Sequence, residues 1–330
     1  MNKNSYISEK LQKKLHKHLI FVKEGCIISG NSNNISKRSM TKMKKTVKIL
    51  SVVLALVLIV GCFAACGGNG DTTPVAKVKV IDINLTEEEY AFGVDKDQTE
   101  LLTQVNQFIA EIKSNGTFDA ICDAYFGDGE KKGVTSAVED ASKDQLVVAT
   151  NAQFEPFEYK EGDTFYGIDM EIAKLLADHL GKELVIKDME FDAVCLSVGQ
   201  HKCDIAMAGL TVNEERTEYV TFSTSYYTAN QKLIVKGDDT TFDACTTAAD
   251  VEAILNGYDE TVKIGFQNGT TGNWYVEGDE DWGFAGFKAT GVGYGSGSLA
   301  VQDLINGNIN LVVIDSDPAK FITTAINEVA

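Results

Sequence analysis

Few side chains in this sequence have the types and spacing that support covalent or metal chemistry. Four of its 7 cysteines lie beyond residue 100, at Cys122, Cys195, Cys203 and Cys245. None of them has the Cys-x-x-Cys or Cys-x-x-His spacing of a zinc site. His179 and His201 each stand among charged residues, which is typical of a surface helix or turn. The sequence also lacks the signatures of serine hydrolases, zinc proteases, phosphate loops and dinucleotide sites. We therefore predict no catalytic residue, no metal and no cofactor.

Binding of a carboxylate is the chemistry that the residues do support. A carboxylate is held best by a planar guanidinium together with backbone N–H groups. Arg216 supplies the guanidinium, and two glycine/threonine turns, Gly209-Leu210-Thr211 and Gly269-Thr270-Thr271, supply backbone N–H groups. The alternative for Arg216 is a solvated cation at the start of a helix, after Asn213-Glu214-Glu215. The residues by themselves leave both interpretations open.

The elements that must position these groups alternate between apolar strands and amphipathic helices, which is typical of an α/β protein with largely parallel sheets. The pattern predicts helices over 99–114, 118–126, 170–180, 298–305 and 318–329. It predicts strands over 78–83, 145–150, 183–188, 204–208, 232–235, 263–266 and 311–314. Residues 127–143 are polar and lack periodicity, so we expect a flexible linker there.

The charge is distributed unevenly along the chain. The 330 residues carry 48 acidic and 30 basic side chains, a net charge of −18. Residues 1–65 hold 12 of the basic residues and two acidic ones, leaving 18 basic and 46 acidic residues, a net charge of −28, in the rest. Such an acidic body argues against binding nucleic acid or an anionic lipid surface through a basic patch.

The basic segment reads as a secretory signal, with lysines at 42–48, an apolar run over 49–60 and small residues after it. Small residues before a cysteine resemble the lipobox of bacterial lipoproteins, which implies a lipidated Cys66, with Cys62 as the alternative. Because this signal is complete from Met43 onward, we hypothesise that translation begins there.

Export from the cell permits disulfides, and a Cys195–Cys203 pair is an open alternative. Four separate buried thiols are favoured, because free cysteine packs as a small hydrophobe.

A family resemblance rests on several motifs in order. These are Val147–Asn151, Phe154-Glu155-Pro156-Phe157-Glu158-Tyr159, Gly167–Ile172, Met189–Ala193, Ala208-Gly209-Leu210-Thr211-Val212-Asn213-Glu214-Glu215-Arg216, Gly269–Gly272 and Val312–Asp315. Together they resemble the extracellular solute-binding proteins of family 3, the polar amino-acid-binding proteins of ABC importers. The resemblance implies a type 2 periplasmic-binding-protein fold, with two α/β lobes, two crossover segments and a ligand cleft between the lobes.

The resemblance also implies roles for individual residues. Arg216, Thr211 and Thr271 would hold the ligand carboxylate, and Asp315, the Gly209 carbonyl and the Thr211 hydroxyl would accept from its ammonium. Phe154 and Phe191 would flank its aliphatic part, although core packing is the alternative for each. Asp315 can at the same time cap a helix. Asn151, Glu155, Asp169 and Gln267 would read the ligand side chain. The predicted ligand-binding residues are Asn151, Phe154, Asp169, Phe191, Gly209, Leu210, Thr211, Arg216, Gln267, Thr270, Thr271 and Asp315.

The order of the motifs departs from the family. Residues 85–127 resemble the carboxyl-terminal end of the family, yet here they precede its amino-terminal end, so the chain resembles a circular permutant. We therefore expect an upstream segment and signal over 1–65, a tether over 66–77 and a first segment of lobe 2 over 78–86. Lobe 1 would then span 87–227, with the permutation linker at 127–143, and lobe 2 would continue over 228–330. Val75 and Ala330 should lie close together, and the crossovers at 84–93 and 223–232 should run side by side.

The function implied by the resemblance is not enzymatic. We expect a lipid-anchored binding protein on the outer face of the cell membrane, which captures a free L-amino acid by hinge closure and delivers it to the permease subunits of an ABC transporter. A monomer is expected. The alternative is a dehydratase that acts on a cyclic carboxylate on the same scaffold, with Glu155 as its acid. Which amino acid is bound cannot be read from these residues.

Overall fold

The computed structural model describes residues 76–329, which form one compact unit. The predicted signal, the lipidation sites Cys62 and Cys66, and Ala330 lie outside the described residues. Over residues 76–329, the helices are all too short or too polar to cross a membrane. The described fold is mixed α/β and contains two five-stranded sheets.

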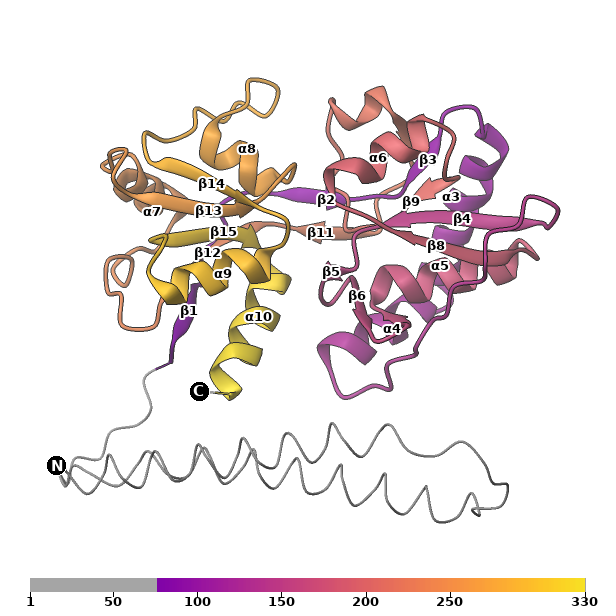
Figure 1. Cartoon of the computed structure of the whole chain (residues 1–330), viewed down its shortest axis with the longest axis horizontal. Coiled ribbons are helices and arrows are strands. Elements are labelled where there is room, and N and C mark those ends of the chain that lie inside the picture. Colours follow the sequence, from indigo (N-terminus) through magenta and orange to yellow (C-terminus); the bar gives the residue numbers. More distant parts are fainter. Residues whose placement is uncertain (1–75, 330) are drawn as a thin grey trace, which may run out of the picture. The chain divides into compact units, whose positions relative to one another are not determined.

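The first sheet is assembled from strands that lie far apart in the sequence. Its spatial order is β1 (Val78–Ile81), β12 (Gln231–Lys236), β15 (Leu311–Asp315), β13 (Lys263–Gln267) and β14 (Thr290–Tyr294). Four helices belong to this part of the chain: α7 (Ala248–Leu255), α8 (Thr271–Glu277), α9 (Gly297–Asn306) and α10 (Ser316–Glu328). Every residue of the central strand β15 is buried, because the sheet is covered by helices (Figure 1).

The second sheet has the order β10 (Val220–Phe222), β3 (Gly93–Asp95), β9 (Ile205–Ala206), β4 (Gln145–Thr150) and β8 (Glu183–Asp188). Its helices are α3 (Thr99–Ser114), α4 (Thr117–Phe126), α5 (Ile168–His179) and α6 (Asp192–Gly199). A small antiparallel sheet of β5 (Gln153–Phe154), β6 (Glu158–Glu161) and β7 (Thr164–Tyr166) leads into α5. In α3 the residues at helical spacing, Leu101, Val105, Phe108, Ile109 and Ile112, are the buried face, as the periodicity predicts.

The expectation of largely parallel sheets is only half right. β4 is parallel to β8 and β9, and β13 is parallel to β14 and β15. In contrast, β3 is antiparallel to both β9 and β10, and β12 is antiparallel to both β1 and β15. β3 and β12 each follow directly after a segment that crosses from one sheet to the other. The direction of each strand is therefore set by that crossover rather than by a helix that covers the sheet.

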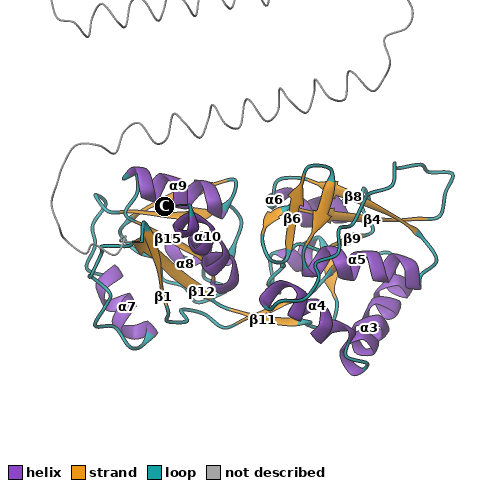
Figure 2. Cartoon of the chain, turned by 90° about the horizontal axis from the view of Figure 1, so that it is seen from below, coloured by secondary structure: helices purple, strands orange, loops and turns teal. Residues whose placement is uncertain are grey.

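Two crossover segments connect the five-stranded sheets. β2 (Glu88–Tyr90) and β11 (Tyr227–Ala229) form a two-stranded antiparallel ribbon, with Tyr227 opposite Tyr90 and Ala229 opposite Glu88. Figures 1 and 2 both place β11 between the two five-stranded sheets. The expected side-by-side arrangement of the crossovers is therefore what the strand pairing shows.

The two ends of the described chain are in contact. The Asn327 side chain near the end of α10 accepts a hydrogen bond from Lys77 N, at 2.9 Å, and donates one to the Val78 carbonyl, at 2.9 Å. The start of β1 therefore lies beside the end of α10. Val75 and Ala330 themselves lie outside the described residues.

Residues 127–143 have little regular structure, as expected, but they are packed rather than a free coil. Val134 is 3% exposed and bridges Phe165 of β7. Ala137 N donates to the Leu184 carbonyl, and Ile186 N donates to the Ser136 hydroxyl, so the segment lies along the free edge of β8. Backbone groups of an edge strand need such partners.

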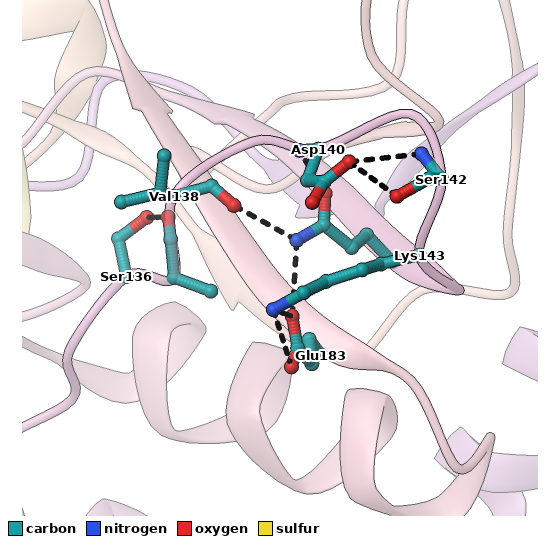
Figure 3. Close-up of polar contacts among 8 residues, drawn as sticks. Ser136, Val138, Asp140, Ser142, Lys143 and Glu183 are labelled. Carbon is teal, nitrogen blue, oxygen red and sulfur yellow. Dashed lines mark hydrogen bonds and ion pairs between the residues drawn. The ribbon is translucent and has the colours of Figure 1, made fainter.

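The end of this segment is held by charge and amide contacts (Figure 3). Lys143 Nζ lies 3.0 Å from a carboxylate oxygen of Glu183. The side-chain amide of Gln145 donates to the Val138 carbonyl and to Glu183, at 2.9 and 3.1 Å. Asp140 accepts from both the backbone and the hydroxyl of Ser142. The flexible-coil expectation missed these contacts because polar side chains give no periodic signal.

Candidate functional site

A small cavity lies between residues of the two five-stranded sheets. From the side of β4 it is lined by Phe154, Phe191, Gly209, Thr211 and Arg216, and from the side of β13 and β15 by Gln267, Thr270, Thr271 and Asp315. Nine of the twelve predicted ligand-binding residues are therefore brought together. The cavity has a free volume of about 10 Å³, which is about enough room for one water molecule. A larger ligand can therefore enter only if the walls of the cavity separate.

Arg216 is the buried cation of this cavity. It opens the short 3₁₀-helix η2 (Arg216–Glu218), and its backbone N–H is capped by the Asn213 side chain at 2.8 Å. With 7% exposure it is not the solvated cation of the alternative interpretation. Burial lowers the pKa of Arg216 from its usual value, because removing water disfavours the charged form.

The guanidinium of Arg216 is fixed from both sides of the cavity. Nη1 donates to the Thr211 carbonyl at 2.7 Å, and Nη2 donates to the Gly269 carbonyl at 2.9 Å. The planar group also lies over two aromatic rings, with its central carbon 5.1 Å from the centre of the Phe191 ring and 5.2 Å from that of the Trp274 indole. A guanidinium held in this way keeps its remaining N–H donors in one plane, which suits a carboxylate.

Asp315 provides the opposite charge. It ends β15 and occupies the N-cap position of α10, but its side chain makes no capping bond. Instead it accepts a hydrogen bond from the Tyr90 hydroxyl at 2.5 Å. Burial and the neighbouring charge of Glu88 raise the pKa of Asp315 to about 7. A cationic group beside it would reverse this shift.

Glu88, on the crossover strand β2, links the cavity to both crossovers. It accepts from the Thr211 hydroxyl at 2.8 Å, from the Thr86 hydroxyl at 2.5 Å and from the Gln231 amide at 3.1 Å. Because the Thr211 hydroxyl donates to Glu88, its lone pairs are left to accept from a ligand. Glu88 is a residue that the sequence analysis missed, since a run of three glutamates there reads as a solvated surface.

Asn151, Asp169 and Leu210 do not line the cavity. Asp169 accepts from Gly209 N at 2.8 Å and from the Tyr226 hydroxyl at 2.6 Å, which fixes the Gly209 turn. Asn151 accepts from the Gln267 amide at 3.0 Å, across the two sheets. Leu210 is buried, and its carbonyl accepts from Ala91 N. These three residues support the cavity wall, and their part in ligand binding stays a prediction.

Glu158 is the most unusual group near the cavity. It is fully buried, and neither of its carboxylate oxygens has a hydrogen-bond partner among the described residues. It pairs directly with Phe154 across the β5–β6 hairpin, so the two side chains share a face, and Phe154 lines the cavity. Burial, then the charges of Asp169 and Asp315, raise the pKa of Glu158 well above its usual value. A buried carboxyl group without a partner is costly, so this position is a candidate for a functional role.

Glu155, the other acidic residue considered for the ligand side chain, pairs with Lys131 at 3.4 Å at the surface. The sequence analysis named Glu155 for this role and did not consider Glu158. A signal existed, however, since Glu158 stands between Phe157 and Tyr159, where a charged residue is unexpected in a partly buried strand.

Cysteines and histidines take no part in the cavity. Cys122, Cys195, Cys203 and Cys245 are free thiols, as favoured, although Cys122 and Cys245 are only partly buried. Burial raises the pKa of Cys122 to about 12. Within residues 76–329, one group has metal-ligand spacing, Asp95, Asp97 and His201. There His201 Nδ1 is 2.7 Å from Asp95, whose negative charge raises the pKa of the imidazole, so the pair is already satisfied.

Comparison with known proteins gives consistent matches. The family described as bacterial extracellular solute-binding proteins, family 3, matches residues 146–318. The arginine-binding extracellular protein ArtP of Bacillus subtilis is 38% identical over 106 residues, which is 32% of this chain and 42% of ArtP. ABC transporter arginine-binding protein 1 of Escherichia coli is 27% identical, over 53% of this chain and 65% of that protein. The chain thus matches less than two thirds of the length of these relatives.

The L-cystine-binding protein TcyJ of Escherichia coli is 27% identical over 56% of this chain and 63% of TcyJ. Among solved structures, holo ArgBP from T. maritima is 31% identical and matches 56% of this chain and 74% of that one, with a TM-score of 0.45. The ancestral amino acid-binding protein AncCDT-1, a precursor of cyclohexadienyl dehydratase, is 30% identical over 55% of this chain and 74% of that one, with a TM-score of 0.47.

The raised pKa of Glu158 predicts how stability depends on pH. Folded Glu158 keeps its proton above the pH at which the unfolded chain loses it, so the free energy of unfolding should fall as pH rises above about 4.5. Glu158→Gln removes this contribution. We expect urea denaturation to show that the variant gains stability over the parent chain as pH rises from about 5 to about 8.

The matched control is Glu161→Gln, on the same strand but exposed, which should leave the pH profile of the parent unchanged. Parallel profiles for the parent and Glu158→Gln would show that Glu158 titrates normally and is not buried in solution.

Proposed function

Because the chain belongs to the bacterial extracellular solute-binding proteins of family 3, we propose that it binds a free amino acid outside the cell membrane and delivers it to the permease subunits of an ABC transporter. The observation that carries this proposal is the opposed pair of charges in the cavity, Arg216 from one side and Asp315 from the other. An α-amino acid carries a carboxylate and an ammonium on the same carbon. Arg216 suits the carboxylate and Asp315 the ammonium.

The turns beside these charges complete the proposed site. Thr211 offers hydroxyl lone pairs and Thr271 has a hydroxyl without a partner among the described residues. The Gln267 side-chain oxygen is likewise without a partner there. Groups that are buried and unsatisfied in this way gain hydrogen bonds when a polar ligand is enclosed. Phe154 and Phe191 add apolar walls for the aliphatic part of the ligand.

The charge balance supports an amino acid with a cationic side chain. Glu88, Glu158, Asp169 and Asp315 are all buried, and Arg216 is the buried cation that shares the cavity region with them. An ammonium can compensate Asp315, but Glu158 still has no partner. A second positive charge on the ligand would give Glu158 a partner and favour its ionised form. Several relatives are named as arginine-binding proteins, which agrees with this proposal.

The alternative of a dehydratase has less support. Such chemistry needs a general acid that faces the leaving group, and Glu155, the acid considered for it, lies in a surface ion pair. The curated relatives described above are named as binding proteins. We therefore propose binding and delivery, without a chemical step.

Attachment to the membrane is also part of the proposal. A lipid on Cys66, or on Cys62, would hold the protein at the outer face of the membrane, with residues 66–77 as a tether, and the protein would act as a monomer. The intact mass of the mature N-terminal peptide tests this. An unlipidated or uncleaved terminus would contradict it.

Replacing Arg216 tests the site itself. Arg216→Ala should abolish measurable amino-acid binding in calorimetry, because losing one partner of a buried charge pair weakens affinity by about a hundredfold or more. The circular dichroism spectrum should remain that of the parent. Lys202, an exposed cation in the loop before β9, provides the control, and Lys202→Ala should bind normally. Retained affinity in Arg216→Ala would contradict the assignment.

The choice of ligand side chain is tested with a neutral analogue. Citrulline has nearly the shape of arginine but lacks its charge. We expect the parent chain to bind arginine at least about tenfold more tightly than citrulline, since a hydrogen bond between charged groups is worth about 1.5–3 kcal/mol. Glu158→Gln should shrink this ratio toward one in calorimetry.

Equal affinities of the parent chain for arginine and citrulline would exclude a cationic ligand while leaving amino-acid binding intact. A thermal-shift screen of the twenty amino acids, cystine and ornithine then identifies the ligand class. Stabilisation by none of them would overturn the binding function as a whole.

We further propose that the chain is a circular permutant of its family. The family match begins at residue 146, beside the start of β4, yet β1 and β3, which precede it, complete the two five-stranded sheets. Asn327 contacts Lys77 and Val78, so the usual order would pass directly from α10 into β1. Residues 127–143 would then be the added connection between the original ends. In this proposal lobe 2 comprises 78–86 and 228–330, and lobe 1 comprises 87–227.

A rearranged chain tests the permutation. It begins at Asp144, runs to Val329 and continues through a short glycine linker into Lys77–Phe126. We expect it to fold and to bind the same amino acids with affinity within about threefold, because circular permutation is tolerated where the ends adjoin at the surface. A control cut inside the buried strand β12, at Leu233, should not fold. Failure of the first chain to fold would count against the permutation.

A further inference from the structure

The Arg216 guanidinium lies over two aromatic rings, those of Trp274 and Phe191. The guanidinium carbon is 5.2 Å from the centre of the indole and 5.1 Å from the phenyl ring. Both distances lie within the range of about 6 Å at which a cation is attracted to a ring face. Arg216 therefore makes cation–ring contacts with two aromatic side chains.

The two rings come from opposite sides of the cavity. Phe191 precedes α6, which packs on β3 and β4, and η2, which carries Arg216, packs on β10 of the same sheet. Trp274 lies on α8, which packs on β13 and β15. Since the cavity walls must separate to admit a ligand, the contact with Phe191 can persist in an open form. The contact with Trp274 requires the closed form.

The indole is held in place by further aromatic rings. Trp282 stacks on Trp274 with ring centres 6.4 Å apart and planes 21° apart, and Phe284 stacks on Trp282 at 5.6 Å and 11°. The backbone groups of Asp279 and Phe284 pair with each other, which closes the loop that carries this stack. Trp274 thus meets Arg216 as a supported, oriented surface rather than as a free side chain.

We propose that Trp274 is a positioning residue that stabilises the closed, ligand-bound form through its cation–ring contact with Arg216, whichever amino acid is bound. The proposal rests on the binding function argued above. The N–H groups of a guanidinium lie in its plane, so Arg216 donates along the edge of that plane. Two edge donors are used by the Thr211 and Gly269 carbonyls, and the others are left for the ligand carboxylate.

The position of Trp274 determines what its loss should do. Trp274 contacts the Arg216 guanidinium, which would bind the carboxylate that all α-amino acids share. Trp274 is not among the residues that line the cavity. Removing it should therefore weaken all ligands by the same factor. Removing a residue that reads the ligand side chain should instead change their order of affinity.

The experiment measures affinities by calorimetry for a panel of amino acids, with the full mature chain. Trp274→Leu keeps an apolar side chain but removes the ring face, and we expect about 5- to 30-fold weaker binding of every amino acid that the parent binds. Trp274→Phe restores a ring face and should return affinity to within about threefold of the parent. Unfolding curves of the variants check that each is folded.

Phe165→Leu is the matched control. Phe165 carries its own cation–ring contact, with Lys160 Nζ at 4.9 Å, but it lies on β7 and does not line the cavity. Phe165→Leu also removes a ring face, and it should leave the affinity for amino acids unchanged.

Three results would overturn the proposal. Unchanged affinity in Trp274→Leu would show that the stack does not contribute to the bound form. A changed order of affinities would assign Trp274 to reading the ligand side chain. Equal loss in Trp274→Leu and Trp274→Phe would show that the size of the indole, not the ring face, determines affinity.

A parent chain that binds no amino acid would overturn the proposed function, and the role of Trp274 with it. Measurements on the parent chain and on the variants therefore separate the two failures.

Discussion

The burial of one guanidinium among several carboxylates constrains the whole centre of this protein. Arg216 loses its water, and its charge is compensated only partly, through carbonyls on both sides of the cavity and two aromatic faces. Around it, Asp315 and Asp169 have pKa values raised to about 7 by burial, and Glu158 has no partner at all among the described residues. A centre of this kind is not optimised for stability, because buried ionisable groups without partners cost free energy. In the proposed function, a ligand with its own charges would supply those partners.

The crossovers are tied to that centre by hydrogen bonds. Glu88 on β2 holds Thr211, and Tyr90 on the same strand donates to Asp315. β2 pairs with β11, so both connecting segments are fixed to groups that line the cavity. Separation of the cavity walls must therefore be accommodated where these strands bend, which is the expected behaviour of hinge segments. The cavity lining and the crossovers are joined through a small number of polar contacts.

In the proposed permutation, the changed order of the elements has little effect on this centre. A sheet depends on which strands adjoin, not on the order in which the chain visits them. β1 completes its sheet beside β12, and β3 completes the other between β9 and β10. What the order does change is the connection over residues 127–143. Because that connection is anchored through Val134 and Ala137 along β7 and β8, it adds contacts to the sheet edge as well as joining two ends.

Much of the fold was readable from local pattern. The amphipathic helix over Thr99–Ser114 and the buried strands over Gln145–Thr150 and Glu183–Asp188 were predicted with the observed bounds. Their periodicity is a property of neighbouring residues, so sequence suffices. The short strands β2, β3 and β11 were missed because their stability comes from partners more than a hundred residues away. The direction of β12 was likewise set by a connection between sheets.

The same division holds for the site. The sequence by itself determined which residue types are present for an amino acid: one guanidinium, two glycine/threonine turns and an aspartate after a buried strand. Only the tertiary structure decided which of them meet, leaving Asp169 and Asn151 behind the wall and bringing Trp274 onto Arg216. It also singled out Glu158, since burial without a partner depends on everything packed around a side chain. The physical reason is that charge and shape are local to a residue, whereas desolvation is imposed by its distant neighbours.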